Sequence, residues 1–450
     1  MRVWIVTVGE PLPIDAEVNR LHRGGMIAQE LIRRGHQVLW WTSTMDHLRK
    51  EHRYKAATTV KMPGGLVLRL LHGVKYSRNI SLRRIWNHYQ IGRQFYREAA
   101  RLPSPDVIMS SFPTIDLCVR STDIGKVFGV PVVLDVRDLW PDIFVNYLPP
   151  AVQPIARLAT QPLVWSTRKA FRDCTGIIGI SERYLQFGLS YAGRERRPQD
   201  AVFPLGYMRP ETPPGDLEGA ASRLKEMGID PRKTICWFVG NFGATYDLAP
   251  VIESARRIER THPHVQFVFS GDGDRFTEWS SSTAGLRNTV FTGWLNASGL
   301  AYLSGVAKIG LAAYGVGAPQ SLPNKIFEYM AAGLPIVTSL GGECQALLEA
   351  HGCGSICTPG DSASFLAALT PYLEDESLRA RRGANALQLF EDRFRADGIY
   401  SAVAGFLEEV ACGGPHTAAN MGVARPCRTD RAPERTDHLP RHDSLTGELL

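Results

Sequence analysis

Apolar residues in the first 200 positions alternate between short β-rich runs and segments with helical spacing. Met26, Ile27, Leu31 and Ile32 fall at helical spacing and are followed by Gly35, which predicts a helix that ends there. Strands separated by helices pair in parallel, so the pattern predicts a doubly wound α/β sheet. The predicted strands are Val3–Val8, Val38–Ser43, Asp106–Ser111, Pro131–Val136 and Thr175–Ser181.

The same pattern restarts after a proline-rich stretch, Met208–Asp216, which is typical of an interdomain linker. Asp247 is placed to cap a helix that carries apolar residues from Leu248 to Ile258. A second α/β unit is therefore predicted. Its strands are Thr234–Gly240, Val265–Ser270, Thr289–Gly293, Lys308–Tyr314 and Pro335–Leu340.

A chain of 450 residues is too long for one ordinary core, which agrees with two domains. We expect Rossmann-like domains at 1–207 and 217–392, joined by a linker at 208–216 and facing each other across a cleft, with ligands at the strand-to-helix turns. Residues 393–412 are expected to form a helix that packs back toward the first domain. Residues 413–450 carry balanced charge without an apolar period, so we expect a disordered tail.

Composition narrows the class of protein. Apolar residues make up 44% of the chain, and no run reaches the roughly 18–20 that a membrane-spanning helix needs. The segment MRVWIVTVGE is typical of a first strand and not of a signal peptide, so we expect a cytoplasmic protein. The eight cysteines include no CxxC pair, which argues against structural zinc.

The positive charge is concentrated in one segment. Between Lys75 and Arg101 there are seven bases and one acid, Glu98, an excess of 7 − 1 = +6 that equals the formal charge of the whole chain. This segment suits an anionic membrane surface, and it equally suits a solvated helix face whose aromatics lie in the core. We expect no nucleic-acid partner. The candidate surface residues are Arg83, Arg84, Trp86, Arg93 and Arg97.

The segment Gln320–Gly333 carries the clearest chemistry. Pro323 suits a first helical turn, whose free N–H groups near Asn324 are suited to hold a diphosphate. Lys325 adds a positive charge, and Glu328 lies one turn on, where it is suited to accept two hydrogen bonds from a ribose diol. The alternative is a surface helix with a Lys–Glu pair three residues apart.

At this segment the chain resembles family 4 glycosyltransferases, and most closely the subgroup that builds bacterial surface polysaccharides. The likeness spans roughly residues 1–410. Its motifs are PNKIFEYMAAGLPIV, VGNFGATYDLAPVIESA, FSGDGDRF, FTGW, GCGSICTPGD and VVLDVRDLWPD, which occur in the family's order along the two domains.

The resemblance implies a GT-B fold and a retaining transfer of a sugar from a nucleoside diphosphate, by default UDP, to a glycan or polyprenyl-diphosphate-linked acceptor. It implies no metal and no other cofactor, because helix N-termini and basic side chains neutralise the diphosphate. It places catalytic roles at Asp138, Arg137 and Gln320. The donor-binding residues that it implies, beside Glu328, Lys325 and Asn324, are Asn241, Gly243, Gly24, Gly25 and Gly271.

Some positions depart from the commonest family pattern. Gln320 stands where a glutamate is common, and Arg137-Asp138 stands where His-Asp is common. Asp272-Gly273-Asp274 has the spacing of a metal-binding D-x-D motif, but a turn with helix-capping aspartates is the favoured interpretation. Two other functions remain open: a nucleotide-sugar epimerase of similar architecture, and a catalytically weak subunit that binds a membrane partner.

Overall fold

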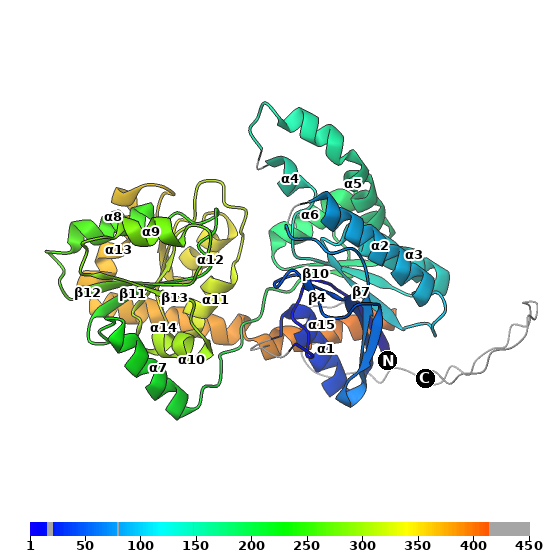
Figure 1. Ribbon diagram of the computed structural model, residues 1–450, viewed down its shortest axis with the longest axis horizontal. Coiled ribbons are helices and arrows are strands. Elements are labelled where there is room, and N and C mark those ends of the chain that lie inside the picture. The colour runs from blue at the N-terminus through cyan, green and yellow to red at the C-terminus, as the bar shows by residue number, and fades with distance from the viewer. Residues whose placement is uncertain (16–20, 79–80, 147, 414–450) are drawn as a thin grey trace, which may run out of the picture.

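The computed structural model describes residues 1–15, 21–78, 81–146 and 148–413. Two α/β lobes lie side by side, each built around one sheet (Figure 1). The predicted tail lies outside the described residues, apart from Gly413. No helix in the described part of the chain is long and apolar enough to cross a membrane.

The N-terminal sheet has eight strands in the order β10-β9-β8-β7-β1-β2-β6-β5. All neighbours are parallel except β5, which pairs antiparallel with β6 at the edge. The strands are β1 (Arg2–Val6), β2 (Gln37–Ser43), β5 (Thr58–Lys61), β6 (Leu66–Leu71), β7 (Val107–Phe112), β8 (Val132–Val136), β9 (Gly176–Gly179) and β10 (Asp200–Val202). A separate hairpin pairs β3 (Met45–Asp46) with β4 (Glu51–His52).

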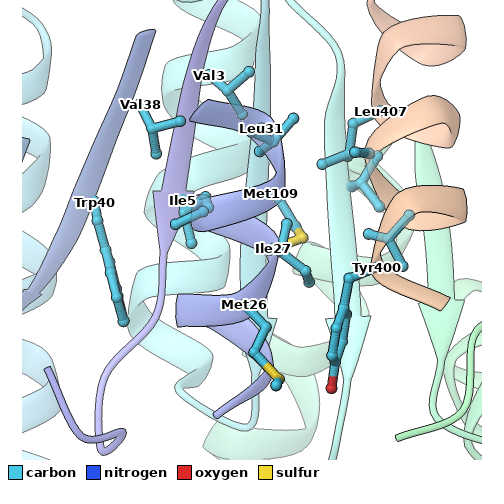
Figure 2. Packing of buried hydrophobic residues seen from close by; sticks show 14 of the residues in the cluster. Val3, Ile5, Met26, Ile27, Leu31, Val38, Trp40, Met109, Tyr400 and Leu407 are labelled. Carbon is cyan, nitrogen blue, oxygen red and sulfur yellow. The ribbon is translucent and has the colours of Figure 1, made fainter. Parts of the chain in front are cut away.

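Residues of β1 alternate between the two faces of this sheet. Val3 and Ile5 pack against α1 and α15 (Figure 2). Trp4 and Val6 belong to the core on the opposite face. The helices are α1 (Arg23–Arg33) and α15 (Ala396–Ala411) on one face, and α2 (Leu82–Ala99), α3 (Ile115–Phe128), α4 (Asp142–Asn146), α5 (Gln153–Asp173) and α6 (Glu182–Ala192) on the other side, with a 3-10 turn η1 (Pro63–Gly65) before β6.

The C-terminal sheet has six parallel strands in the order β13-β12-β11-β14-β15-β16. The strands are β11 (Thr234–Val239), β12 (Val265–Ser270), β13 (Thr289–Gly293), β14 (Ile309–Ala312), β15 (Ile336–Thr338) and β16 (Gly354–Ile356). The helices are α7 (Pro214–Glu226), α8 (Ala249–Ile258), α9 (Phe276–Ser282), α10 (Ala297–Val306), α11 (Asn324–Ala331), α12 (Glu343–His351), α13 (Ser362–Glu374) and α14 (Glu376–Arg393).

The chain crosses between the lobes twice, and the two crossings are hydrogen-bonded to each other. The Tyr207 N–H donates to the Phe394 carbonyl at 3.0 Å, and the Ala396 N–H donates to the Tyr207 carbonyl at 3.1 Å. From this junction α15 returns to the N-terminal domain and packs on α1. The linker was predicted to end at residue 216, but α7 already begins at Pro214. Proline is well suited to the first turn of a helix.

Candidate functional site

A cavity of about 360 Å³ lies between the two domains. The loop after β9 and the chain near the linker form its N-terminal side, whereas the turn after β11 and the start of α11 form the C-terminal side. Its walls are Ile180, Tyr184 and Leu205 on the first side and Val239, Gly240, Tyr246, Gln320, Ser321, Leu322, Pro323, Asn324, Lys325 and Glu328 on the second. Four of the predicted site residues, Gln320, Asn324, Lys325 and Glu328, therefore come together here.

Two stacked glycine turns form the floor beside this cavity. Gly240 has φ 154° and Gly271 has φ 136°, values that side chains rarely tolerate. A Cβ on Gly271 would lie 1.8 Å from the Gly240 carbonyl oxygen, and a Cβ on Gly240 would lie 3.0 Å from Lys325 Nζ. Gly271 thus packs against Gly240, which lines the cavity, and does not line the cavity itself. The two predicted residues of the turn after β11, Asn241 and Gly243, follow Gly240 but do not line the cavity.

Lys325 lies on the first turn of α11 with only 5% of its surface exposed. Its Nζ is 3.7 Å from the ring centre of Phe238 and 3.9 Å from that of Tyr246. It has no hydrogen-bond partner among the described residues. Burial holds the pKa of Lys325 well below its usual value, against the opposing effect of the Glu328 charge. Lys325 thus lines the cavity, and aromatic rings surround its ammonium.

Two further polar residues, Glu328 and Gln320, lie in the cavity wall. Glu328 lies one helical turn after Lys325 and is half-buried at the cavity. The Oε1 of Gln320 is buried without a hydrogen-bond partner among the described residues. Buried acceptors are normally paired, so this carbonyl oxygen is available to a ligand hydroxyl.

The lobes also meet beside the cavity through polar contacts that the sequence analysis did not anticipate. The Arg183 N–H, at the start of α6, donates to Glu343 at 2.6 Å. The Ser321 hydroxyl donates to the same carboxylate, and Ser181 lies 3.2 Å from Ser321. A carboxylate of the C-terminal domain thus satisfies a helix N-terminus of the other domain.

Gly24 and Gly25 lie in the first turn of α1, where the Gly24 N–H is bound by a carboxylate of the same domain. The Gly24 N–H donates to both oxygens of Glu10, at 3.1 and 2.9 Å. A Cβ on Gly24 would also lie 2.8 Å from Thr7. The start of α1 therefore binds an internal carboxylate, and neither glycine lines the cavity.

Arg137 belongs to a buried ion network with that carboxylate. Its Nε donates to Asp135 at 2.6 Å and its Nη1 to Glu10. Arg23 Nε contacts Asp135 at 3.0 Å, so Asp135 is shared by two guanidinium groups. Burial raises the pKa of Asp135, but the charges of Arg23 and Arg137 outweigh burial and the pKa lies below its usual value. Arg137 thus makes ion pairs within the N-terminal domain and does not line the cavity.

Asp138 follows directly and also lies outside the cavity wall. Its Oδ1 accepts a hydrogen bond from the Leu139 N–H at 2.8 Å. Burial raises the pKa of Asp138, and this hydrogen bond and the nearby charge of Arg84 partly offset the effect. A partly buried carboxyl with a raised pKa is a common feature of functional sites.

Four of the five residues of the predicted basic surface are exposed, and the fifth, Arg84, is half-buried. Arg83, Trp86, Arg93 and Arg97 are exposed on α2. Arg84 instead points inward, where its guanidinium lies 4.6 Å over the ring of Trp140. Neighbouring helical residues differ by about 100°, which turns Arg84 away from the face that presents Arg83. Arg84 is therefore only partly available to an external surface.

The D-x-D segment forms a turn. Asp272 Oδ1 accepts a hydrogen bond from the Gly273 N–H at 2.7 Å, and the Asp272 carbonyl accepts one from the Phe242 N–H at 2.9 Å. Among the described residues there is no group of three or more side chains that would suit a metal ion.

Two facing parallel α/β domains, with a cavity at the strand-to-helix turns between them, define the GT-B architecture of glycosyltransferases. Residues 222–389 match the family "Glycosyl transferases group 1". The C-terminal domain therefore resembles the glycosyltransferases of this group.

Individual relatives are distant. The chain is 22% identical to alpha-D-kanosaminyltransferase of Streptomyces kanamyceticus over 293 residues, which is 64% of this chain and 72% of that protein. The structure of Anabaena Alr3699/HepE in complex with UDP matches with TM-score 0.62 at 16% identity, covering 91% of this chain and 99% of that one. WaaG, a glycosyltransferase involved in lipopolysaccharide biosynthesis, matches with TM-score 0.62 at 15% identity, covering 90% and 99%. These structures share the fold.

Proposed function

We propose that this glycosyltransferase moves a hexosyl unit from a UDP-sugar, with retention of configuration, to a lipid-linked or glycan acceptor in surface polysaccharide synthesis. The observation that carries the donor side is the Lys325 ammonium, buried beside the cavity without a hydrogen-bond partner among the described residues. A buried charge without a counter-charge is costly, and a diphosphate in the cavity would supply one. The UDP complex of the Anabaena protein supports the choice of base.

The start of α11 adds a second element of donor binding. No side chain caps this helix, which begins at Asn324 after Pro323. Its first N–H groups border the cavity and carry the positive end of the helix dipole. As the bond to the sugar breaks, negative charge grows on the diphosphate, and these groups and Lys325 stabilise that charge without a metal ion.

Gln320 is the proposed contact to the transferred sugar, because its unpaired carbonyl oxygen lies in the same wall. Asp138 and Arg137 are proposed to act on the acceptor side, in the N-terminal domain. The donor is to be identified by transfer and hydrolysis assays with a panel of nucleotide sugars. Turnover of none of them would leave the catalytically weak subunit as the better interpretation, and isomerisation without transfer would favour the epimerase.

Glu328→Ala is expected to lower kcat/KM for the donor by roughly 10–150-fold. The carboxylate lies at the cavity one turn from Lys325, and a hydrogen bond to a charged group is worth about 1.5–3 kcal/mol. Steady-state kinetics with saturating acceptor measures the effect. Glu226→Ala, on the exposed side of α7, is the matched control. An unchanged donor constant in folded Glu328→Ala would remove this residue from the donor site.

Treatment with a chelator is expected to leave transfer activity essentially intact. The proposed neutralisation of the diphosphate uses Lys325 and the start of α11, and Asp272 is engaged in its own turn. The assay compares activity before and after dialysis against EDTA, with manganese and magnesium added back. Activity that returned only with added metal would contradict the metal-free mechanism.

A lipid-linked acceptor keeps its chain in the bilayer, so the enzyme is proposed to work as a peripheral protein on the cytoplasmic face of the membrane. The exposed bases of α2, Arg83, Arg93 and Arg97, suit an anionic leaflet. Trp86 is 53% exposed on the same helix, and its ring stacks on Tyr89 at 5.1 Å.

A further inference from the structure

The first half of α5 is poorly covered by the rest of the domain. The buried residues of this 21-residue helix are Thr167, Ala170 and Phe171, all in its last two turns. In Figure 1, α4 and the start of α5 stand out from one end of the N-terminal lobe. A helix that contributes so little to a core is normally polar, but this one is not.

Large apolar side chains on this projecting part face solvent. Leu158 is 75% exposed, Ile155 69% and Trp165 64%. These three residues and Pro162 have i, i+3, i+7 and i+10 spacing, which places them on one face of the helix. Leu148 and Val152 continue the exposed apolar surface in the preceding loop. We call the face formed by Ile155, Leu158, Pro162 and Trp165 the α5 stripe.

The segment that carries the stripe has four bases but no acidic residue between Asp142 and Asp173. The bases are Arg157, Arg168, Lys169 and Arg172, and among them Lys169 is paired with Asp123 and Asp173. Apolar residues with a tryptophan and flanking bases are the composition of helices that lie in the interface of an anionic membrane. A second copy of the chain would bring like charges together.

The α5 stripe lies at the same end of the domain as the first turn of α2. Arg84 of that turn lies over Trp140, and Trp140 packs on Phe144 of α4 at 4.5 Å. Leu82, 85% exposed, and Trp86 belong to the same part of α2. The exposed bases at the start of α2 thus lie near the α4–α5 segment, so a single membrane surface can contact both.

We propose that the α4–α5 projection is a membrane-docking element that inserts the α5 stripe into the acyl boundary of an anionic leaflet. The bases of α2 attract the domain to the surface, and burial of the stripe then holds it there. This proposal does not depend on the identity of the donor, because it concerns a surface away from the cavity.

The test is binding of the full chain to vesicles of phosphatidylcholine with and without phosphatidylglycerol, measured by flotation. The variant Ile155→Ser/Leu158→Ser/Trp165→Ser is expected to bind the anionic vesicles at least about tenfold more weakly than the wild type. Arg83→Glu/Arg93→Glu/Arg97→Glu is expected to lose most binding at low salt. Wild-type binding that persists at high salt would show the apolar contribution, because screening removes only the electrostatic part.

The matched control is Val127→Ser/Trp294→Ser, which changes apolar residues that are 59% and 78% exposed elsewhere. It should bind vesicles as the wild type does. Donor hydrolysis without vesicles should be equal in all these proteins, which separates failure of docking from failure of the donor site. Equal vesicle binding by the stripe variant would overturn the proposal. The proposal would also be overturned if the wild type were a dimer and the stripe variant a monomer, because the stripe would then be the contact between two copies.

Discussion

Lys325→Met is expected to lower kcat for sugar transfer by about 10²–10³-fold, the usual cost of losing one preorganised group that stabilises transition-state charge. The same change is expected to raise the melting temperature of the free enzyme. Methionine replaces the lysine side chain among Phe238, Tyr246 and Tyr314 with an unbranched apolar chain one atom shorter. It removes an ammonium that is buried without a hydrogen-bond partner among the described residues. A gain in stability together with a loss of activity is expected where a binding site destabilises the free enzyme but is needed for catalysis.

The control is Lys308→Met, which alters an exposed lysine and should change neither quantity. The pH dependence gives a second check. Burial lowers the pKa of Lys325 in the folded chain, so the unfolded chain holds the extra proton up to the ordinary value of about 10.4. The destabilisation caused by Lys325 therefore decreases as pH rises from the lowered pKa of the folded chain toward the ordinary pKa. The gain in stability of the methionine variant over the wild type should decrease over the same pH range. Full activity in Lys325→Met would contradict the proposed diphosphate contact.

The strands were predictable where a short β-rich run is bounded by turn residues. Val265–Ser270 and Thr289–Gly293 have the predicted bounds in the structure. The strands β5 and β6 were not predicted, because they form an antiparallel edge without an intervening helix and so break the alternation on which the assignment relied.

The grouping of three site residues at one cavity was predictable because they come from one continuous segment. Gln320, Lys325 and Glu328 are eight residues apart at most, so a local pattern of turn and helix places them together. The network around Arg137 joins Glu10, Arg23 and Asp135 from three distant segments. Only the strand order of the sheet brings β1 and β8 close enough for it, and a sequence pattern does not reveal such pairs.

Asp135→Asn is expected to destabilise the protein by about 3–5 kcal/mol, the usual cost of removing one partner from a buried ion network. Asp135 is fully buried and is shared by Arg23 and Arg137, so the asparagine leaves two guanidinium groups with Glu10 as the remaining carboxylate. Equilibrium unfolding in urea measures the change. Asp230→Asn, in a pair with exposed Arg232, is the control and should leave the midpoint unchanged.

The pH dependence of this loss has a definite sign. The pKa of Asp135 is lower in the folded chain than its usual value, so its contribution to stability is present above the usual value and is lost as pH falls through the lowered one. The difference between wild type and Asp135→Asn should therefore narrow in acid. Because the network ties the start of α1 to the loop after β8, the variant should also lose acceptor-dependent transfer more than donor hydrolysis. An equally stable variant would show that the two arginines find other partners, and that the network does not hold these two turns together.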